Sequence, residues 1–197
     1  MEIVLALAGF AFVTSVTPGP NNILLLGSGL RFGFWPTLPH IAGIQFGFAL
    51  QLALCAYGIG LIIVTVPQTA LVVKIIGTGY LLYLAWGLRS NIIKDSDCGT
   101  SKPFTFVQAA LFQFINPKAW LMSTTAGSVF VPNLESQFWS VLLLCLVFNL
   151  VGTPSSGSWA LIGAIIHRYL KDVFWQRIFS GSMVVITLYT AFAIWFF

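Results

Sequence analysis

The chain has 197 residues, of which 58% are hydrophobic and only 7% are charged, and its formal net charge is +4. Soluble domains carry about 25% charged residues, so this composition excludes an ordinary soluble protein and indicates an integral membrane protein. The few cations are scattered over short polar segments and form no dense basic face, which argues against a nucleic-acid partner.

Long apolar stretches predict six membrane-spanning helices, because a helix needs about 20 apolar residues to cross a bilayer. The first stretch lacks the basic n-region of a signal peptide and is too long for its h-region, so we interpret it as a span. We expect an all-α membrane protein with one transmembrane domain, 1–197. Its expected spans are residues 3–29, 39–65, 70–89, 104–130, 138–163 and 175–196.

A polar segment, 90–103, divides the chain into repeat one, 1–89, and repeat two, 104–197. Three spans per repeat is an odd number, so the two repeats enter the membrane from opposite sides, as in transporters built from inverted repeats. Cytoplasmic loops are enriched in Lys and Arg, which makes the segment a cytoplasmic linker and places both termini on the non-cytoplasmic side. Lys74 is the only basic loop residue expected on the non-cytoplasmic side. Seven are expected on the cytoplasmic side: Arg31, Arg89, Lys94, Lys102, Arg168, Lys171 and Arg177.

The first span contains Pro18-Gly19-Pro20 followed by Asn21 and Asn22. Proline removes a backbone donor, so the helix should break here, and in a membrane the freed groups must face protein or a watery cavity. The half-helix that follows presents free amides and its positive dipole end to an anion. The two asparagines add donors and acceptors for a polar substrate. A plain structural kink is the alternative, since Pro and Gly are frequent in membrane helices.

The fourth span contains Asn116-Pro117-Lys118, about half a chain further on. At ~1.5 Å per residue, Lys118 lies near the bilayer centre, where an ammonium costs roughly 2.5 to 3.5 kcal/mol unless it pairs or reaches an interface. We expect Lys118 to face a wet cavity and bind an anionic group of the substrate, or to lose its proton part of the time because burial disfavours the charged form. No midplane carboxylate is predicted, because every acidic residue falls in a loop or terminus: Glu2, Asp95, Asp97, Glu135 and Asp172.

The fifth span supplies further candidates for a substrate-binding site. Pro154 predicts a third break, which favours Asn149, Thr153 and Ser155 as residues that line the same cavity. The alternative is that these small and polar residues only let helices pack closely. Broken helices at matching places in two halves are typical of a midplane binding site in a secondary transporter.

The second span carries a histidine, two glutamines and a pair of glycines. His40 is a candidate for proton coupling beside Lys118, because a histidine titrates near neutral pH; a polar cap at the interface is the alternative. Gln45 and Gln51 are further polar candidates, whereas Gly43 and Gly47 are expected to pack against a neighbouring helix.

The chain resembles a known family at these motifs. Thr-Pro-Gly-Pro-Asn at 17–21, the Gly79 to Trp86 segment and Asn116-Pro117-Lys118 are similar to those of lysine-exporter-type (LysE/RhtB) amino-acid translocators, over nearly the whole chain. At 18–26 and 152–161 the chain is most similar to the branch that exports cysteine and O-acetylserine.

The resemblance implies an exporter of small amino acids or their derivatives in the bacterial cytoplasmic (inner) membrane, driven by a proton gradient. Many relatives carry an acidic residue in the second span where Gln51 or its neighbours stand here, which argues against a carboxylate-based proton relay. A cationic substrate is disfavoured, because the predicted cavity holds Lys118 and no acid. The expected partners are an amino acid, protons and lipid; no enzymatic activity, cofactor or metal is expected, and a homo-oligomer is left open.

Two other classes of function are weighed against export. Cys55 and Cys145 lie in the second spans of the two repeats and could form a membrane thiol–disulfide relay, although neither lies beside a proline break. An ion channel is disfavoured, because the sequence contains no charged ring or carbonyl filter.

Overall fold

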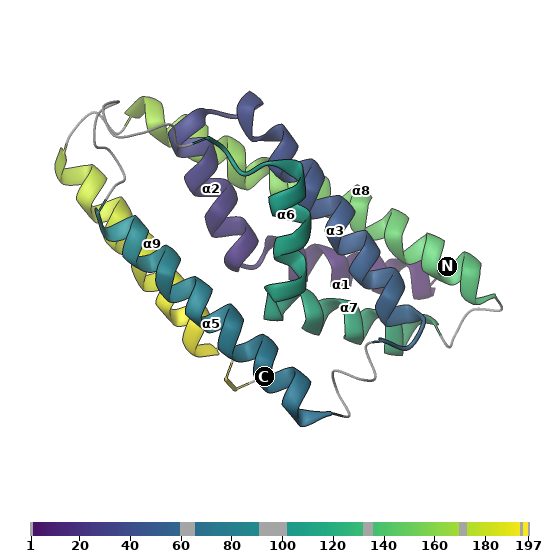
Figure 1. The fold of residues 1–197 in the computed structure, drawn as a ribbon. Helices are drawn as coiled ribbons and strands as arrows, with labels where there is room; N and C mark the ends of the chain where they lie inside the picture. The colour runs from purple at the N-terminus through teal and green to yellow at the C-terminus, as the bar shows by residue number, and fades with distance from the viewer. Residues whose placement is uncertain are drawn as a thin grey trace.

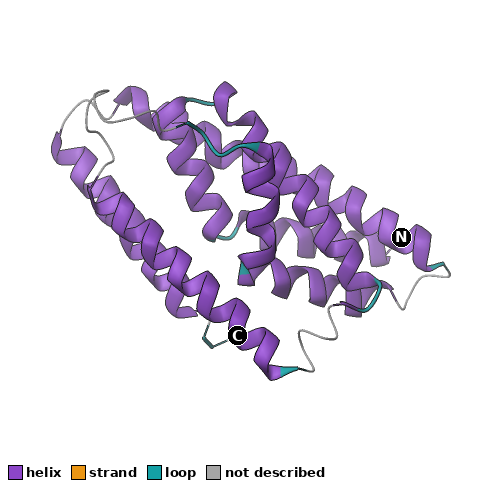
Figure 2. Ribbon diagram, in the orientation of Figure 1, coloured by secondary structure: helices purple, strands orange, loops and turns teal. Residues whose placement is uncertain are grey.

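The computed structural model describes residues 2–59, 66–90, 102–131, 136–169, 173–193 and 195–196. Within these segments the secondary structure is helical, with short turns and no strand (Figure 2). The prediction of an all-α protein is therefore confirmed. The expected linker, 90–103, lies mostly outside the described residues, and so do four of the five acidic residues.

The first half of the chain forms four α-helices in the part that is described. A bend of 56° separates α1 from α2, so the predicted break around Pro18 is confirmed. The helices are α1 (Glu2–Val16), α2 (Pro20–Phe32), the short 3₁₀ helix η1 (Trp35–Thr37), α3 (Leu38–Ala56) and α5 (Pro67–Ser90).

The second half follows the same order. A one-residue interruption at Asn116 separates η2 from α7, and Pro117 then begins the next helix, so the second predicted break is also confirmed. The helices are α6 (Phe106–Phe112), the 3₁₀ helix η2 (Gln113–Ile115), α7 (Pro117–Phe130), α8 (Gln137–Tyr169) and α9 (Val173–Ala193).

Length and hydropathy identify two helices among the described residues that can cross a membrane, Trp35–Ala56 and Gln137–Ile166. The bent pair α1 and α2 qualifies as a third span if it is counted as one. The other expected spans contain shorter apolar helices, at Leu71–Tyr83, Phe106–Ile115 and Gly181–Ala193. A membrane protein is thus supported, and the total of six spans stays a prediction.

The third predicted break, at Pro154, is wrong. Helix α8 continues without interruption from Gln137 to Tyr169 with this proline inside it. A single proline removes one amide from the helix, and its ring lies on the exposed side of α8, away from the other helices. The break at α1–α2 has two prolines around a glycine, so that two amides are missing within three residues. The break before Pro117 has a single proline, so the number of prolines alone does not decide the outcome.

Close glycine contacts hold the helices together where they cross. Gly43 and Gly47 of α3 leave no room for a Cβ against the backbone of α6, which confirms their predicted packing role. Gly29 of α2 and Gly163 of α8 form the corresponding close approach between those two helices. Two of the crossings that frame the site are therefore fixed by backbone contact.

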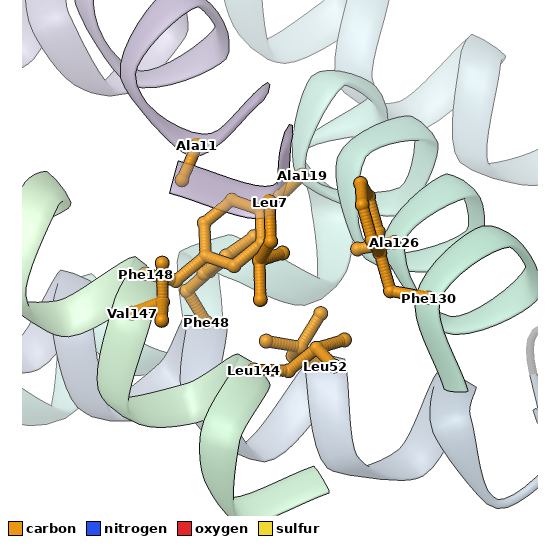
Figure 3. Packing of buried hydrophobic residues seen from close by; sticks show 10 residues of the cluster. All are labelled: Leu7, Ala11, Phe48, Leu52, Ala119, Ala126, Phe130, Leu144, Val147 and Phe148. Atoms are coloured by element: carbon orange, nitrogen blue, oxygen red, sulfur yellow. The ribbon is translucent and has the colours of Figure 1, made fainter. Parts of the chain in front are cut away.

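The main hydrophobic core lies among α1, α3, α7 and α8 (Figure 3). Aromatic side chains of α3 and α8 meet at its centre, where the Phe48 and Phe148 rings are 5.2 Å apart between centroids. Helices α5 and α9 pack along each other at one side of the molecule (Figure 1), with Leu81 and Ala191 buried between them. Two of the core rings also line the cavity described next.

Candidate functional site

A cavity of about 50 Å³ lies between the two broken helices and the long helices α3 and α8. One water needs roughly 10–15 Å³ of such a cavity, so there is room here for more than one water. Among the described residues that line it none is acidic and Lys118 is the only one with a titratable side chain; the lining residues are Thr14, Ser15, Gly19, Asn21, Asn22, Ile44, Gln45, Phe48, Asn116, Lys118, Ala119, Met122, Phe148, Gly152 and Ser156.

At the first break the start of α2 has no side-chain cap. Gly19 is the N-cap residue, in an extended conformation that suits the residue before Pro20, and no side chain in the described part of the chain caps the first amides of the helix. The end of α1 is capped instead by Asn22, whose Nδ2 donates to the carbonyl oxygens of Ser15 at 3.0 Å and Thr17 at 2.8 Å. The free amides of α2 are thus available to an anion.

At the second break the backbone is satisfied by its own segment. The side-chain oxygen of Asn116 accepts a hydrogen bond from the Lys118 amide at 3.1 Å, which caps α7. The indole Nε1 of Trp120 donates to the Phe114 carbonyl at 2.9 Å. Asn116 is buried, so this cap is shielded from solvent.

The Lys118 side chain crosses from the second break to the first. Its Nζ donates to the Thr17 carbonyl oxygen at 2.6 Å and to the Thr17 hydroxyl at 3.0 Å. The aliphatic chain lies against Gly19, where an added Cβ would be 2.7 Å from the lysine Cδ. Among the described residues, the ammonium is therefore held by neutral oxygens at the cavity wall.

A pair of side-chain amides forms a second link between the breaks. Asn21 Nδ2 donates to Gln113 Oε1 at 2.8 Å, and Gln113 Nε2 donates back to Asn21 Oδ1 at 3.2 Å and to the Ala109 carbonyl at 2.9 Å. Gln113 is fully buried. The sequence analysis missed Gln113, although a glutamine four residues before a proline inside an apolar span was a usable signal.

The wall opposite the breaks is formed by α3 and α8. Gln45 Nε2 donates to the Ser156 hydroxyl at 3.0 Å, and the glutamine side chain packs against Gly152. Ser156 and Gly152 are four residues apart, so they occupy the same face of α8. The sequence identified Gln45 as a polar candidate but did not single out Ser156.

Four of the predicted site residues do not line the cavity. Pro18 and Thr153 are exposed, and Asn149 donates to the Cys145 carbonyl of its own helix at 2.8 Å. Ser155 is buried, and its hydroxyl has no partner among the described residues. Because each helical residue is rotated by about 100° from the last, the face of α8 that carries Gly152 and Ser156 turns Thr153 and Ser155 away.

His40 also lies outside the cavity lining. Its ring is buried and stacks on Phe104 with centroids 5.0 Å apart, and neither nitrogen has a hydrogen-bond partner among the described residues. Gln51 is also fully buried, and neither its amide nitrogen nor its amide oxygen has a hydrogen-bond partner among the described residues. The coupling role of His40 stays a prediction, without a contact to the cavity that would support it.

The two intramembrane thiols have separate partners. Cys55 lies 3.3 Å from the Ser123 hydroxyl of α7, whereas Cys145 points at the Ala49 carbonyl of α3 at 3.6 Å. Neither cysteine lines the cavity. This arrangement offers no direct exchange between the thiols, and Cys98 lies outside the described residues.

An apolar helical protein whose two proline-broken helices meet at a shared polar cavity has the architecture of a membrane transporter. The chain belongs to the LysE type translocator family, whose model matches residues 12–197. It is accordingly a membrane transporter of amino acids and not an enzyme, as the sequence motifs predicted.

Curated relatives agree with this assignment. The chain is 30% identical over 189 residues to the cysteine/O-acetylserine efflux protein of Escherichia coli O157:H7, covering 95% of this chain and 94% of the relative. The cysteine/O-acetylserine efflux protein of Escherichia coli strain K12 matches with the same identity and coverage. No solved structure matches the chain.

Proposed function

We propose that this protein exports small neutral amino acids or their derivatives, of the kind represented by cysteine and O-acetylserine, in exchange for protons across a bacterial cytoplasmic membrane. One observation carries the proposal: the Lys118 ammonium reaches both helix breaks in a cavity whose lining contains no acid. A half-buried cation at a membrane cavity, without a carboxylate partner among the described residues, favours a substrate that brings its own anionic group.

The carboxylate of the substrate would bind between Lys118 and the start of α2. The Thr17 carbonyl and hydroxyl oxygens accept hydrogen bonds from the lysine at 2.6 and 3.0 Å, and a carboxylate is a stronger acceptor than either because its bonds are charge-assisted. The uncapped amides at the start of α2 supply further donors. Asn116 would hold Lys118 in register through its cap on α7.

Proton coupling would act through the same lysine. Lys118 is the one titratable side chain among the described residues that line the cavity. The charged form binds a carboxylate, and the neutral form releases it, so substrate release and proton exchange would share one group. His40 is not among the described residues that line the cavity and plays no part in this scheme.

Alternating access would follow from two inverted repeats. The helix packing supports this division: α8 packs on both parts of the first broken helix, α3 packs on both parts of the second, and α5 packs on α9. Exchanging the two halves of the chain reproduces this pattern, which is expected of a pseudo-two-fold axis. The orientation with both termini on the non-cytoplasmic side, and any homo-oligomer, remain parts of the proposal.

Everted membrane vesicles that contain the protein provide the direct test. Labelled neutral amino acids, including cysteine and O-acetylserine, are expected to accumulate when a proton gradient is imposed and not when it is collapsed. Lys118→Met should abolish accumulation, whereas Lys74→Met, on α5 and outside the cavity lining, should leave it unchanged. Accumulation that is independent of the gradient, or equal in both variants, would contradict the proposal.

The thiol relay receives no comparable support. Cys55 and Cys145 have separate partners and neither lines the cavity. Replacing both cysteines with serine should therefore leave transport intact. Loss of all activity in this double variant would favour the relay.

A further inference from the structure

A zwitterionic substrate brings an ammonium as well as a carboxylate, and an ammonium donates three hydrogen bonds and accepts none. After the first break, Asn21 is paired with Gln113, whereas Asn22 donates its Nδ2 to α1 carbonyls and leaves its Oδ1 as one acceptor. Three donors call for more than one acceptor, so a further acceptor is sought among the lining residues of α3 and α8.

We infer that Gln45 is a specificity-determining residue that binds the substrate ammonium through its amide oxygen. This inference rests on the proposed function. Gln45 lines the cavity together with Lys118, so one small substrate can reach both side chains. Ser156 accepts the Nε2 donor at 3.0 Å, which fixes the orientation of the amide and leaves Oε1 as its free acceptor.

Gly152 provides the room in which this acceptor lies. An added Cβ at Gly152 would be 3.0 Å from Gln45 Oε1 and 3.5 Å from Nε2, so any larger residue would move the oxygen first. The three residues form one unit: Ser156 orients the amide, Gly152 admits it, and Gln45 presents an oxygen. A neutral acceptor suits a neutral zwitterion, whereas a substrate with a second cation would leave one charge without a counter-charge in this cavity.

The apolar part of the lining completes the selectivity. Phe48 and Phe148, with centroids 5.2 Å apart, and Met122 also line the cavity. They leave small apolar space for a short side chain such as a thiol or an ester. Lys118 and Gln45 would then bind the carboxylate and the ammonium that all α-amino acids share, and the apolar residues would limit the size of the substrate side chain.

Truncated analogues of cysteine separate the two contacts. Inhibition of labelled cysteine uptake into everted vesicles, under reducing conditions, is measured for cysteine, for 3-mercaptopropionate, which lacks the ammonium, and for cysteamine, which lacks the carboxylate. In Gln45→Leu the apparent affinity for cysteine should fall about tenfold, as expected for the loss of one hydrogen bond to a charged group. The apparent affinity for 3-mercaptopropionate should not change, because that analogue has no ammonium to contact Gln45.

Variants of the same unit guard against a general folding defect. Gly152→Ala keeps Gln45 but displaces its oxygen. The apparent affinity for cysteine should therefore fall less than in Gln45→Leu, and that for 3-mercaptopropionate should again stay unchanged. Gln51→Leu is the matched control, since it makes the same change in the same helix at a buried glutamine outside the cavity lining. It should leave all three inhibitors unchanged, and the amount of each protein in the membrane is measured in parallel.

The outcomes distinguish this inference from the proposed function. Equal weakening of cysteine and 3-mercaptopropionate in Gln45→Leu, or no weakening of either, would overturn the role of Gln45 while leaving cysteine export in place. Failure of the wild-type protein to accumulate cysteine or any other neutral amino acid would overturn the proposed function and this inference together.

Discussion

The break between α1 and α2 and the break between η2 and α7 expose the same kinds of backbone group, but these groups find partners in different places. At the second break, Asn116 caps its own helix and Trp120 bonds a carbonyl six residues earlier. At the first break, no side chain caps α2, and the Thr17 carbonyl is bonded by Lys118 from the other half of the chain. The backbone groups of the second break are bonded within their own segment, whereas those of the first are bonded by Asn22 and also by Lys118 from the other half of the chain.

This difference indicates which break responds to a ligand. A capped helix start has little to offer an anion, because its amides are already bonded. An uncapped start retains its donors and its dipole, and a lysine that rests on a neutral carbonyl can exchange that partner for a carboxylate. The second break would thus act as a support that positions Lys118, and the first would act as the binding surface.

Removing the amide of Asn22 should have the largest effect on folding. Asn22→Leu keeps a similar volume but leaves the Ser15 carbonyl without its side-chain donor and weakens the contact at Thr17. An unsatisfied carbonyl costs about 1–3 kcal/mol, so the midpoint of thermal unfolding in detergent should fall clearly. Asn149→Leu is the matched control, because its amide bonds only a carbonyl of its own helix and should matter less. Equal losses in the two variants would contradict the special role of the first break.

Adding one methyl group at Gly19 should disturb the lysine without straining the backbone. The φ of −168° is an extended value that alanine also adopts, but its Cβ would lie 2.7 Å from Lys118 Cδ and force the side chain to move. We expect the apparent affinity for substrate to fall about tenfold, equivalent to about 1.4 kcal/mol, with little change in unfolding. Gly9→Ala has open space around its Cβ and is the control. Unchanged affinity in Gly19→Ala would show that the observed position of the Lys118 side chain is not needed for substrate binding.

Loss of the cap on the second break should have a moderate and structural effect. Asn116→Ala removes the oxygen that accepts the Lys118 amide, and the loss of an N-cap costs about 1 kcal/mol. Asn116→Asp keeps an acceptor and should retain most of the stability, which thermal unfolding in detergent can measure. If alanine abolished transport while the unfolding midpoint stayed constant, Asn116 would be a substrate ligand and the second break would not be a passive support.

The broken helices could be predicted from the sequence because their cause is local. Two prolines around a glycine, or a proline after an asparagine, remove backbone donors whatever the rest of the fold does. The same rule failed at Pro154, since one missing amide on an exposed side did not end α8. The number of prolines and their surroundings, which depend on packing, decide between a break and an uninterrupted helix.

The candidate site could be predicted only where the breaks define it. Lys118, Gly19, Asn21, Asn22 and Asn116 all line the cavity, because they flank the prolines. The contribution of α8 could not be predicted, since a membrane helix can be apolar on every side and its sequence then gives no direction toward the cavity. Contacts between distant segments, such as that of Gln113 with Asn21, depend on the crossing of the two broken helices and leave no local pattern.

The smallest effect is expected at Thr153, which the sequence placed in the site and the structure places on the exposed side of α8. Thr153→Val keeps the shape of the side chain and removes only its hydroxyl, so neither the cysteine transport rate nor its apparent affinity should change. Ser156→Ala, three residues further along the same helix, frees the Gln45 amide to rotate and should weaken cysteine. Uptake into everted vesicles compares the two directly. A loss in Thr153→Val that matched the loss in Ser156→Ala would mean that α8 turns its Thr153 face inward during transport, and that the difference between its two faces belongs to one conformation alone.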